Sequence, residues 1–153
     1  MTAFAAIVRC IWRTVAVTGL VLGATDAGAQ LTVSGSPARM RVLTATAGFS
    51  LVAVTNASTT YRICSSGNGR HAITAHLNSP MPAGVTLKVD LAVSGGAESS
   101  GAVTLSTMAR NVVTGITKRT NDLSITYTLS ATTAAGVVAF ETRSVTFTLI
   151  STP

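Results

Sequence analysis

The segment "VTLKVDLAV", residues 85–93, decides the fold class of this chain. Every odd-numbered position in it is apolar, and Thr86, Lys88 and Asp90 lie between these positions. Successive side chains of a strand point to opposite faces of the sheet. The pattern therefore predicts a β-strand with one face on a hydrophobic core and the other face in water.

Two later segments repeat this alternation. In "LSITYTLSA", residues 123–131, apolar residues alternate with serine and threonine, and "RSVTFTLI", residues 143–150, follows the same rule. The β-branched residues threonine and valine favour the pleated, half-buried surface of a sheet. No convincing helix stands in the sequence after residue 30, so the segments predict an all-β protein.

Weaker strands and turn signals fill the rest of the chain. Such short strands at close spacing indicate a β-sandwich or a barrel, and the unequal strand lengths and long loops favour the antiparallel sandwich. We expect "GVVAFE", residues 136–141, to pair with the final strand and to contribute to the core. The further strands are expected at 31–35, 41–47, 50–55, 59–64, 71–77, 102–106 and 110–116, with loops at 78–84, 94–101, 118–122 and 132–136.

The first 29 residues have the composition of a secretory signal peptide. Arg9 and Arg13 precede an uncharged, mostly apolar run at 14–25, and the small residues "AGA" occupy 27–29. A basic start, a short apolar stretch and a small-residue cleavage site define such a signal, and the run is shorter than the ~20 residues of a membrane-spanning helix. We therefore expect cleavage after residue 29, a single domain at 30–153 with no membrane span, and a periplasmic or extracellular location. The alternative is an uncleaved N-terminal anchor.

Charge and cysteine content narrow the choice of partners. Residues 30–153 contain nine Lys/Arg and four Asp/Glu, a net charge of +5, but these charges are scattered rather than clustered. A scattered excess indicates a sparsely charged surface and no nucleic-acid partner.

Cleavage removes Cys10 and leaves Cys64, which cannot form an intramolecular disulfide. A leftover cysteine is a buried thiol, an intermolecular link or a reactive group, and the sequence leaves these three open.

The stretch "CSSGNGRHAITAH", residues 64–76, is the one place where reactive side chains gather. A Cys64–His71 dyad would need a third group to orient the imidazole, and no acidic residue lies near in sequence. His71 and His76 are five positions apart, so on a strand their side chains point to opposite faces of the sheet and should not converge on one metal ion. Asn68-Gly69 is instead a strong signal for a tight hairpin turn between the strands at 59–64 and 71–77. We therefore assign no catalytic, cofactor-binding or metal-binding residue and expect no enzyme.

The run from 77 to 151, through "SPMPAGVTLKVDLAV", "LSITYTLSA" and "SVTFTLI", resembles small secreted bacterial β-sandwich proteins and is similar to the immunoglobulin-like subunits of surface fibres. The resemblance implies an immunoglobulin-like sandwich with a non-enzymatic surface or periplasmic role, including assembly by strand addition. No functional residue is carried over by it.

These observations lead to an expected function without catalysis and without a cofactor. The chain is expected to be a structural or protein-interaction subunit of the cell envelope, either of a surface fibre or as an extrinsic accessory subunit on a periplasm-facing membrane complex. Its partners would then be proteins, which could use exposed strand edges. The alternative is a β-sandwich module that binds a small ligand or a metal.

Overall fold

In the computed structural model the chain forms two antiparallel β-sheets, which confirms the all-β prediction. The structure describes residues 29–42, 52–64, 69–118 and 120–153. The predicted signal peptide therefore lies, apart from Ala29, outside the described residues, as do most of the strand expected at 41–47 and the turn residue Asn68. Across the described ranges, no helix has the length and apolar character needed to cross a membrane.

The first sheet has five strands in the order β1-β2-β8-β4-β6. Two of the segments with the clearest alternation, 85–93 and 123–131, form neighbouring strands at its centre. These strands are antiparallel, and their register is unbroken from Val85 opposite Ala131 to Leu91 opposite Ile125. Its strands are β1 (Gln30–Ser34), β2 (Val54–Cys64), β8 (Leu123–Ala131), β4 (Val85–Leu91) and β6 (Val103–Thr104).

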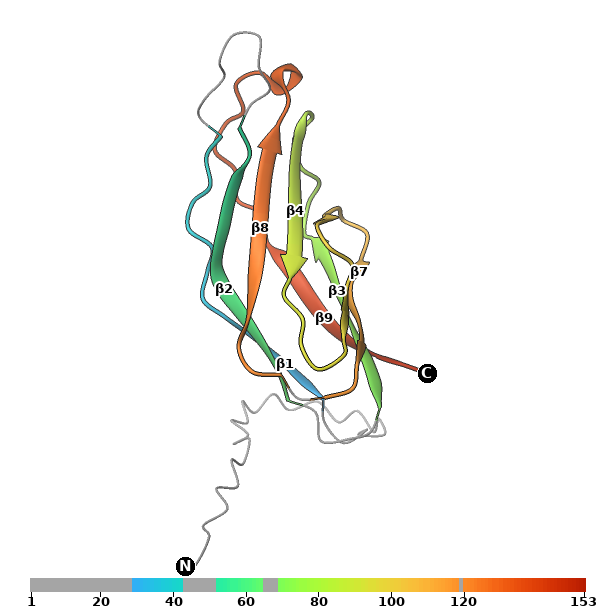
Figure 1. The fold of residues 1–153 in the computed structure, drawn as a ribbon. Coiled ribbons are helices and arrows are strands. Elements are labelled where there is room, and N and C mark those ends of the chain that lie inside the picture. Colours follow the sequence, from blue (N-terminus) through green and yellow to red (C-terminus); the bar gives the residue numbers. More distant parts are fainter. Residues whose placement is uncertain (1–28, 43–51, 65–68, 119) are drawn as a thin grey trace, which may run out of the picture.

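The second sheet has four strands in the order β5-β7-β3-β9. It lies behind the first sheet in Figure 1, where β3 and β9 run side by side. Its strands are β5 (Glu98–Ser99), β7 (Arg110–Ile116), β3 (Arg70–Leu77) and β9 (Val145–Thr152).

One hydrophobic core joins the two sheets, giving a β-sandwich-like arrangement. Val89, Leu91 and Ile125 of the first sheet are buried, as the period-two pattern predicts. They share a cluster with buried residues of the second sheet, and removal of this apolar surface from water is the main favourable term in folding. The buried members of the cluster are Tyr61, Ile63, Ile73, Ala75, Leu77, Val89, Leu91, Leu105, Val112, Val113, Ile116, Ile125 and Tyr127.

The predicted hairpin between 59–64 and 71–77 is wrong. Cys64 ends β2 in the five-stranded sheet, whereas Arg70 begins β3 in the four-stranded sheet. β2 pairs with β1 and β8, and β3 pairs with β7 and β9. From β2 onward, each described strand lies in the sheet opposite to that of its predecessor. The connection at 65–69 therefore joins two sheets rather than two paired strands.

The strand expected at 136–141 is also absent. After β8 the chain forms a single 3-10 turn, η1 (Thr133–Ala135), and no strand follows until β9. Val137, Val138 and Phe140 are exposed to solvent, so this segment does not contribute to the core. The partner of β9 is β3, in a register that is regular from Leu77 opposite Val145 to Arg70 opposite Thr152.

Candidate functional site

The reactive residues of the stretch 64–76 are separated in the fold. Cys64 is half-buried at the end of β2, opposite Gln30, whereas His71 lies on β3 of the other sheet, between Ser151 and Ile116. His76 is half-buried and lies opposite Thr146. Among the residues that the structure describes, no group of three or more His, Cys, Asp and Glu side chains could hold a metal ion.

The outer edge of β9 is the most distinctive feature of the surface. Among the strands that the structure describes, β9 ends the four-stranded sheet and pairs only with β3, over eight consecutive residues without a bulge. The other strands at sheet edges are shorter: β1 has five residues, and β5 and β6 have two each. Proteins usually protect long edges with charges, prolines or bulges. The sequence of β9, "VTFTLIST", contains none of these.

The backbone of β9 presents every second residue to this open edge. The Asn78 amide donates to the Ser144 carbonyl at 3.0 Å, and the Thr74 hydroxyl reaches the Thr148 carbonyl at 3.5 Å, so even-numbered residues face β3. In an antiparallel pair, N–H and C=O groups alternate between the two sides of a strand. The odd-numbered residues therefore turn their backbone donors and acceptors toward the open edge, where no strand of the described ranges pairs with them. They are Val145, Phe147, Leu149 and Ser151.

A groove of about 500 Å³ runs beside this edge, between β9 and the start of the five-stranded sheet. Phe147 and Val145 of β9 form one wall, and Val33 of β1 contributes to the other. Val145, Phe147 and Leu149 are only partly buried against the core, and the first two of them line the groove. The complete lining is Val33, Gly35, Pro37, Thr59, Tyr127, Arg143, Ser144, Val145, Thr146 and Phe147.

Two polar side chains from neighbouring strands of the first sheet lie at this groove. Thr59 is 1% exposed, and its hydroxyl has no hydrogen-bond partner among the described residues. Burial raises the pKa of Tyr127. The Thr59 hydroxyl lies close enough to the Tyr127 hydroxyl to lower this pKa, but the two groups do not form a hydrogen bond of normal geometry. A buried polar atom without a hydrogen-bond partner is uncommon in folded proteins.

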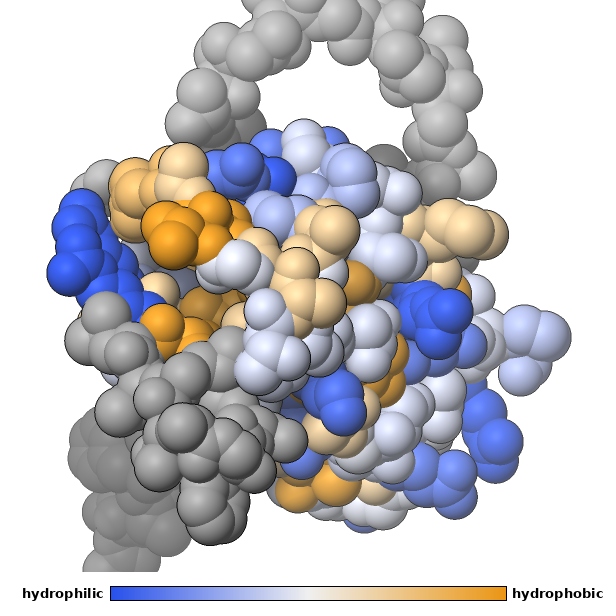
Figure 2. Space-filling view, turned by 90° about the horizontal axis from the view of Figure 1, so that it is seen from above, coloured by the Kyte–Doolittle hydropathy of each residue, from blue (hydrophilic) through white to orange (hydrophobic). Residues whose placement is uncertain are grey.

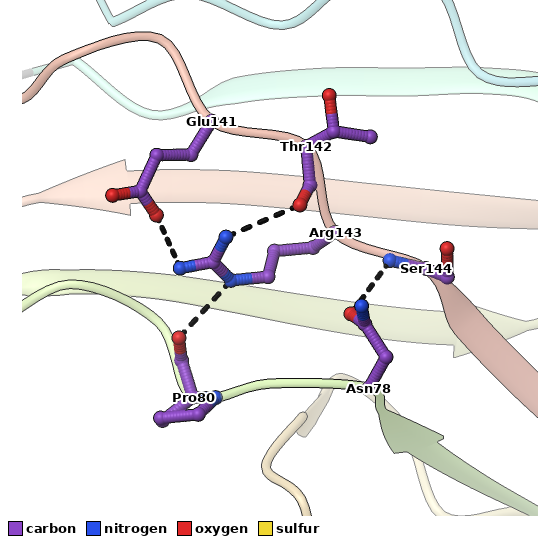
Figure 3. A network of polar contacts seen from close by, with 6 residues as sticks. All are labelled: Asn78, Pro80, Glu141, Thr142, Arg143 and Ser144. Atoms are coloured by element: carbon purple, nitrogen blue, oxygen red, sulfur yellow. Dashed lines mark hydrogen bonds and ion pairs between the residues drawn. The ribbon is translucent and has the colours of Figure 1, made fainter.

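A polar network fixes where β9 begins. As Figure 3 shows, Arg143 donates to the Pro80 carbonyl at 3.0 Å and to the Thr142 carbonyl at 3.1 Å, and it forms an ion pair with Glu141. In the same region the Asn78 side chain accepts a hydrogen bond from the Ser144 amide at 2.9 Å. The residues before β9 are therefore held to the segment that leaves β3, which keeps β9 in register with β3.

The end of the molecule at which β8 finishes carries exposed apolar side chains. Figure 2 views this end and shows apolar surface between polar residues. Val52, Val137 and Phe140 are 68%, 103% and 67% exposed, and the Arg39 guanidinium lies 4.4 Å from the centre of the Phe140 ring. Sequence reasoning missed this surface, because it assigned 136–141 to the core.

Burial of the two tyrosines is expected to make the stability of the fold sensitive to alkaline pH. Tyr61 is 2% exposed and donates from its hydroxyl to the Ala92 carbonyl at 2.5 Å. Burial raises its pKa to about 12, from the ordinary value of 10. Below pH 10 the folded and unfolded states both keep the proton. As the pH rises from 10 to 12, the unfolded state loses the proton first, and folding becomes less favourable.

We expect the free energy of unfolding to fall by about 1–3 kcal/mol between pH 10 and pH 12 because of Tyr61. Tyr61→Phe should lower stability by about 1 kcal/mol at neutral pH, since the Ala92 carbonyl loses its donor, and should flatten the alkaline fall. Urea titrations at pH 8, 10 and 12 on both proteins measure this. An equally steep fall of the unfolding free energy between pH 10 and pH 12 in both proteins would contradict the assignment to Tyr61.

Comparison of the chain with protein-family models, with curated proteins and with solved structures finds no match in any of the three.

Proposed function

We propose that this protein is an exported, non-enzymatic interaction subunit of the cell envelope that binds a protein partner through the open edge of β9. The observation that carries the proposal is the edge itself: eight residues in regular register, with no charge, proline or bulge to block strand addition. Strand addition supplies affinity through main-chain hydrogen bonds and specificity through pockets for alternate side chains. The adjoining groove, with its apolar Val33 and Phe147, is suited to receive such side chains.

Export and an immunoglobulin-like arrangement are part of this proposal. The signal-like composition of residues 1–29 supports export. The two antiparallel sheets around one core support the resemblance to immunoglobulin-like envelope subunits. Both versions of the role, a fibre subunit and an accessory subunit of a periplasm-facing membrane complex, use the same edge.

The test is site-specific photo-crosslinking of the full chain expressed in a bacterial host, with fractionation of the cells into cytoplasm and envelope. A photoreactive residue at Thr148, which is exposed on β9, should give adducts with protein in the envelope fraction. The matched control is Ser124, which is exposed on the central strand β8 and should give none. An adduct to another protein or to a second copy supports the proposal that a protein partner binds at the edge of β9. Equal labelling at both positions, or retention of the chain in the cytoplasm, would overturn the proposal.

A small-ligand module is the second candidate function, favoured by the groove of about 500 Å³ and by the unsatisfied Thr59 hydroxyl beside it. Pockets of this size that are largely apolar, with a few polar groups, are typical of small-molecule sites. Native mass spectrometry of the purified protein, before and after organic extraction, decides between the two. A bound compound whose removal lowers the melting temperature would favour the ligand module.

A further inference from the structure

We propose that a second copy of this chain fills the open edge, through antiparallel pairing of β9 with β9 about a two-fold axis at Thr148. The inference rests on the proposed function, because it names the strand that the edge receives. The two four-stranded sheets would then form one continuous sheet across the dimer. A two-fold dimer uses the same surface on both copies, so the edge must be complementary to itself.

The backbone permits only some registers. The odd-numbered residues of β9 present their N–H and C=O groups outward, so an odd residue of one copy must face an odd residue of the other. With the axis at Thr148, Phe147 faces Leu149 of the second copy and Val145 faces Ser151. Each of these pairs occurs twice, and every residue from Val145 to Ser151 finds a partner within the strand.

Neighbouring registers fit less well. An axis at Phe147 would place Ser151 opposite Arg143, which lies before β9 and is already bonded to Pro80 and Glu141. An axis at Leu149 would place Val145 opposite Pro153, which has no N–H to donate, and would pair Phe147 with a serine. The register centred on Thr148 therefore keeps the most backbone pairs within the strand.

Side-chain matching also favours this register. On the inner face the apolar Phe147 and Leu149 come together, which extends the partly buried apolar surface along the groove. On the outer face Thr146 meets Ile150, whose side chain is 38% exposed in the single chain, and Thr148 meets Thr148. β-branched pairs of this kind stabilise antiparallel strands.

The charge distribution permits a second copy despite the positive net charge. β9 contains no charged residue, so pairing brings no like charges into direct opposition. The remaining repulsion between two basic chains acts over longer distances and is screened within about 8 Å at physiological salt. A partner selected by electrostatic attraction would need acidic or basic groups at this edge, and the strand has none.

Charge substitutions at the axis test the inference on purified protein without any partner. Thr148→Lys places two ammonium groups together in the dimer, and Thr148→Glu places two carboxylates together, so each variant alone should be monomeric by sedimentation equilibrium. An equimolar mixture should regain a dimer that contains one chain of each kind, because opposite charges then face each other. The control Ser124→Lys, on the exposed face of β8, should remain dimeric like the unmodified chain.

Disulfide trapping tests the register itself. In a background in which serine replaces Cys10 and Cys64, Thr148→Cys should cross-link to itself on mild oxidation, since a non-hydrogen-bonded antiparallel pair brings the two Cα atoms to about 4.5 Å. Thr146→Cys is also exposed but faces Ile150 of the second copy, so it should cross-link about tenfold more slowly.

The outcomes separate this inference from the proposed function. A monomeric unmodified protein at all accessible concentrations, or a dimer that persists in Thr148→Lys, would overturn pairing between two β9 strands. If the photoreactive group at position 148 nevertheless labels a different envelope protein, the edge still binds a partner and the proposed function stands. If position 148 labels nothing and the purified protein is monomeric, both fail.

Discussion

Replacement of Ile125 by alanine is expected to lower the free energy of unfolding by about 2–5 kcal/mol. Ile125 is fully buried on β8, where it lies between Thr59 of β2 and Leu91 of β4. Its side chain is therefore surrounded on both sides within the sheet, and it faces the second sheet across the core. Little can move to fill the space that alanine would leave, so the cost should lie well above that of an exposed site.

Urea denaturation followed by circular dichroism at pH 7 measures this effect, and Ser124→Ala is the matched control. Ser124 is the neighbour of Ile125 on the same strand but is exposed, so its replacement should change stability by less than about 0.5 kcal/mol. The dependence of the unfolding free energy on urea should stay unchanged, which identifies a pure change of stability. A loss below about 1 kcal/mol in Ile125→Ala would contradict closure of one core around β8.

Ile125 also illustrates what could be predicted from the sequence. Because strand side chains alternate strictly, "LSITYTLSA" and "VTLKVDLAV" determine which residues face inward, and Tyr127, Val89 and Leu91 are buried as expected. The prediction of an all-β chain with two antiparallel sheets follows from the same period. The buried face of a strand can be predicted from the sequence of that strand alone.

The choice of partner strand is not local, and there the sequence reasoning was wrong. An alternating strand shows that one face is buried but does not show which strand lies beside it. "TTYRIC" and "HAITAHL" have apolar faces that suit a hairpin, and Asn68-Gly69 suits its turn, yet the two strands lie in opposite sheets and bury their apolar residues in one shared core. The same faces satisfy both arrangements, so the pattern could not separate them.

The second error explains why the candidate site was missed. The segment 136–141 is apolar enough to resemble a strand, and in that position it would have covered the open edge of β9. Arg143 instead bonds to Pro80, and the chain before β9 is held against the segment after β3. No described strand pairs with the outer edge of β9, and Val137 and Phe140 stay exposed. Polar contacts between residues far apart in the sequence produce no periodic pattern, so sequence periodicity could not predict them.

Gly84→Ala is expected to lower the free energy of unfolding by about 2–4 kcal/mol, from backbone strain and from a steric clash together. Gly84 has a φ of +75°, and a Cβ there would lie 2.9 Å from the Ala135 amide nitrogen and 2.8 Å from the Thr132 hydroxyl oxygen. The Gly84 carbonyl also accepts a hydrogen bond from the Thr132 amide at 2.8 Å. The turn before β4 is thus packed directly against the 3-10 turn that follows β8.

Gly96→Ala separates the two causes of this loss. Gly96 has a similar φ of +87°, but a Cβ there would meet no atom within 4 Å. Its replacement should therefore cost only the backbone strain, about 1–2 kcal/mol. The difference between the two variants in thermal or urea unfolding isolates the clash between the turn and residues 132–135. Equal losses would mean that the contact between the Gly84 turn and residues 132–135 yields without cost.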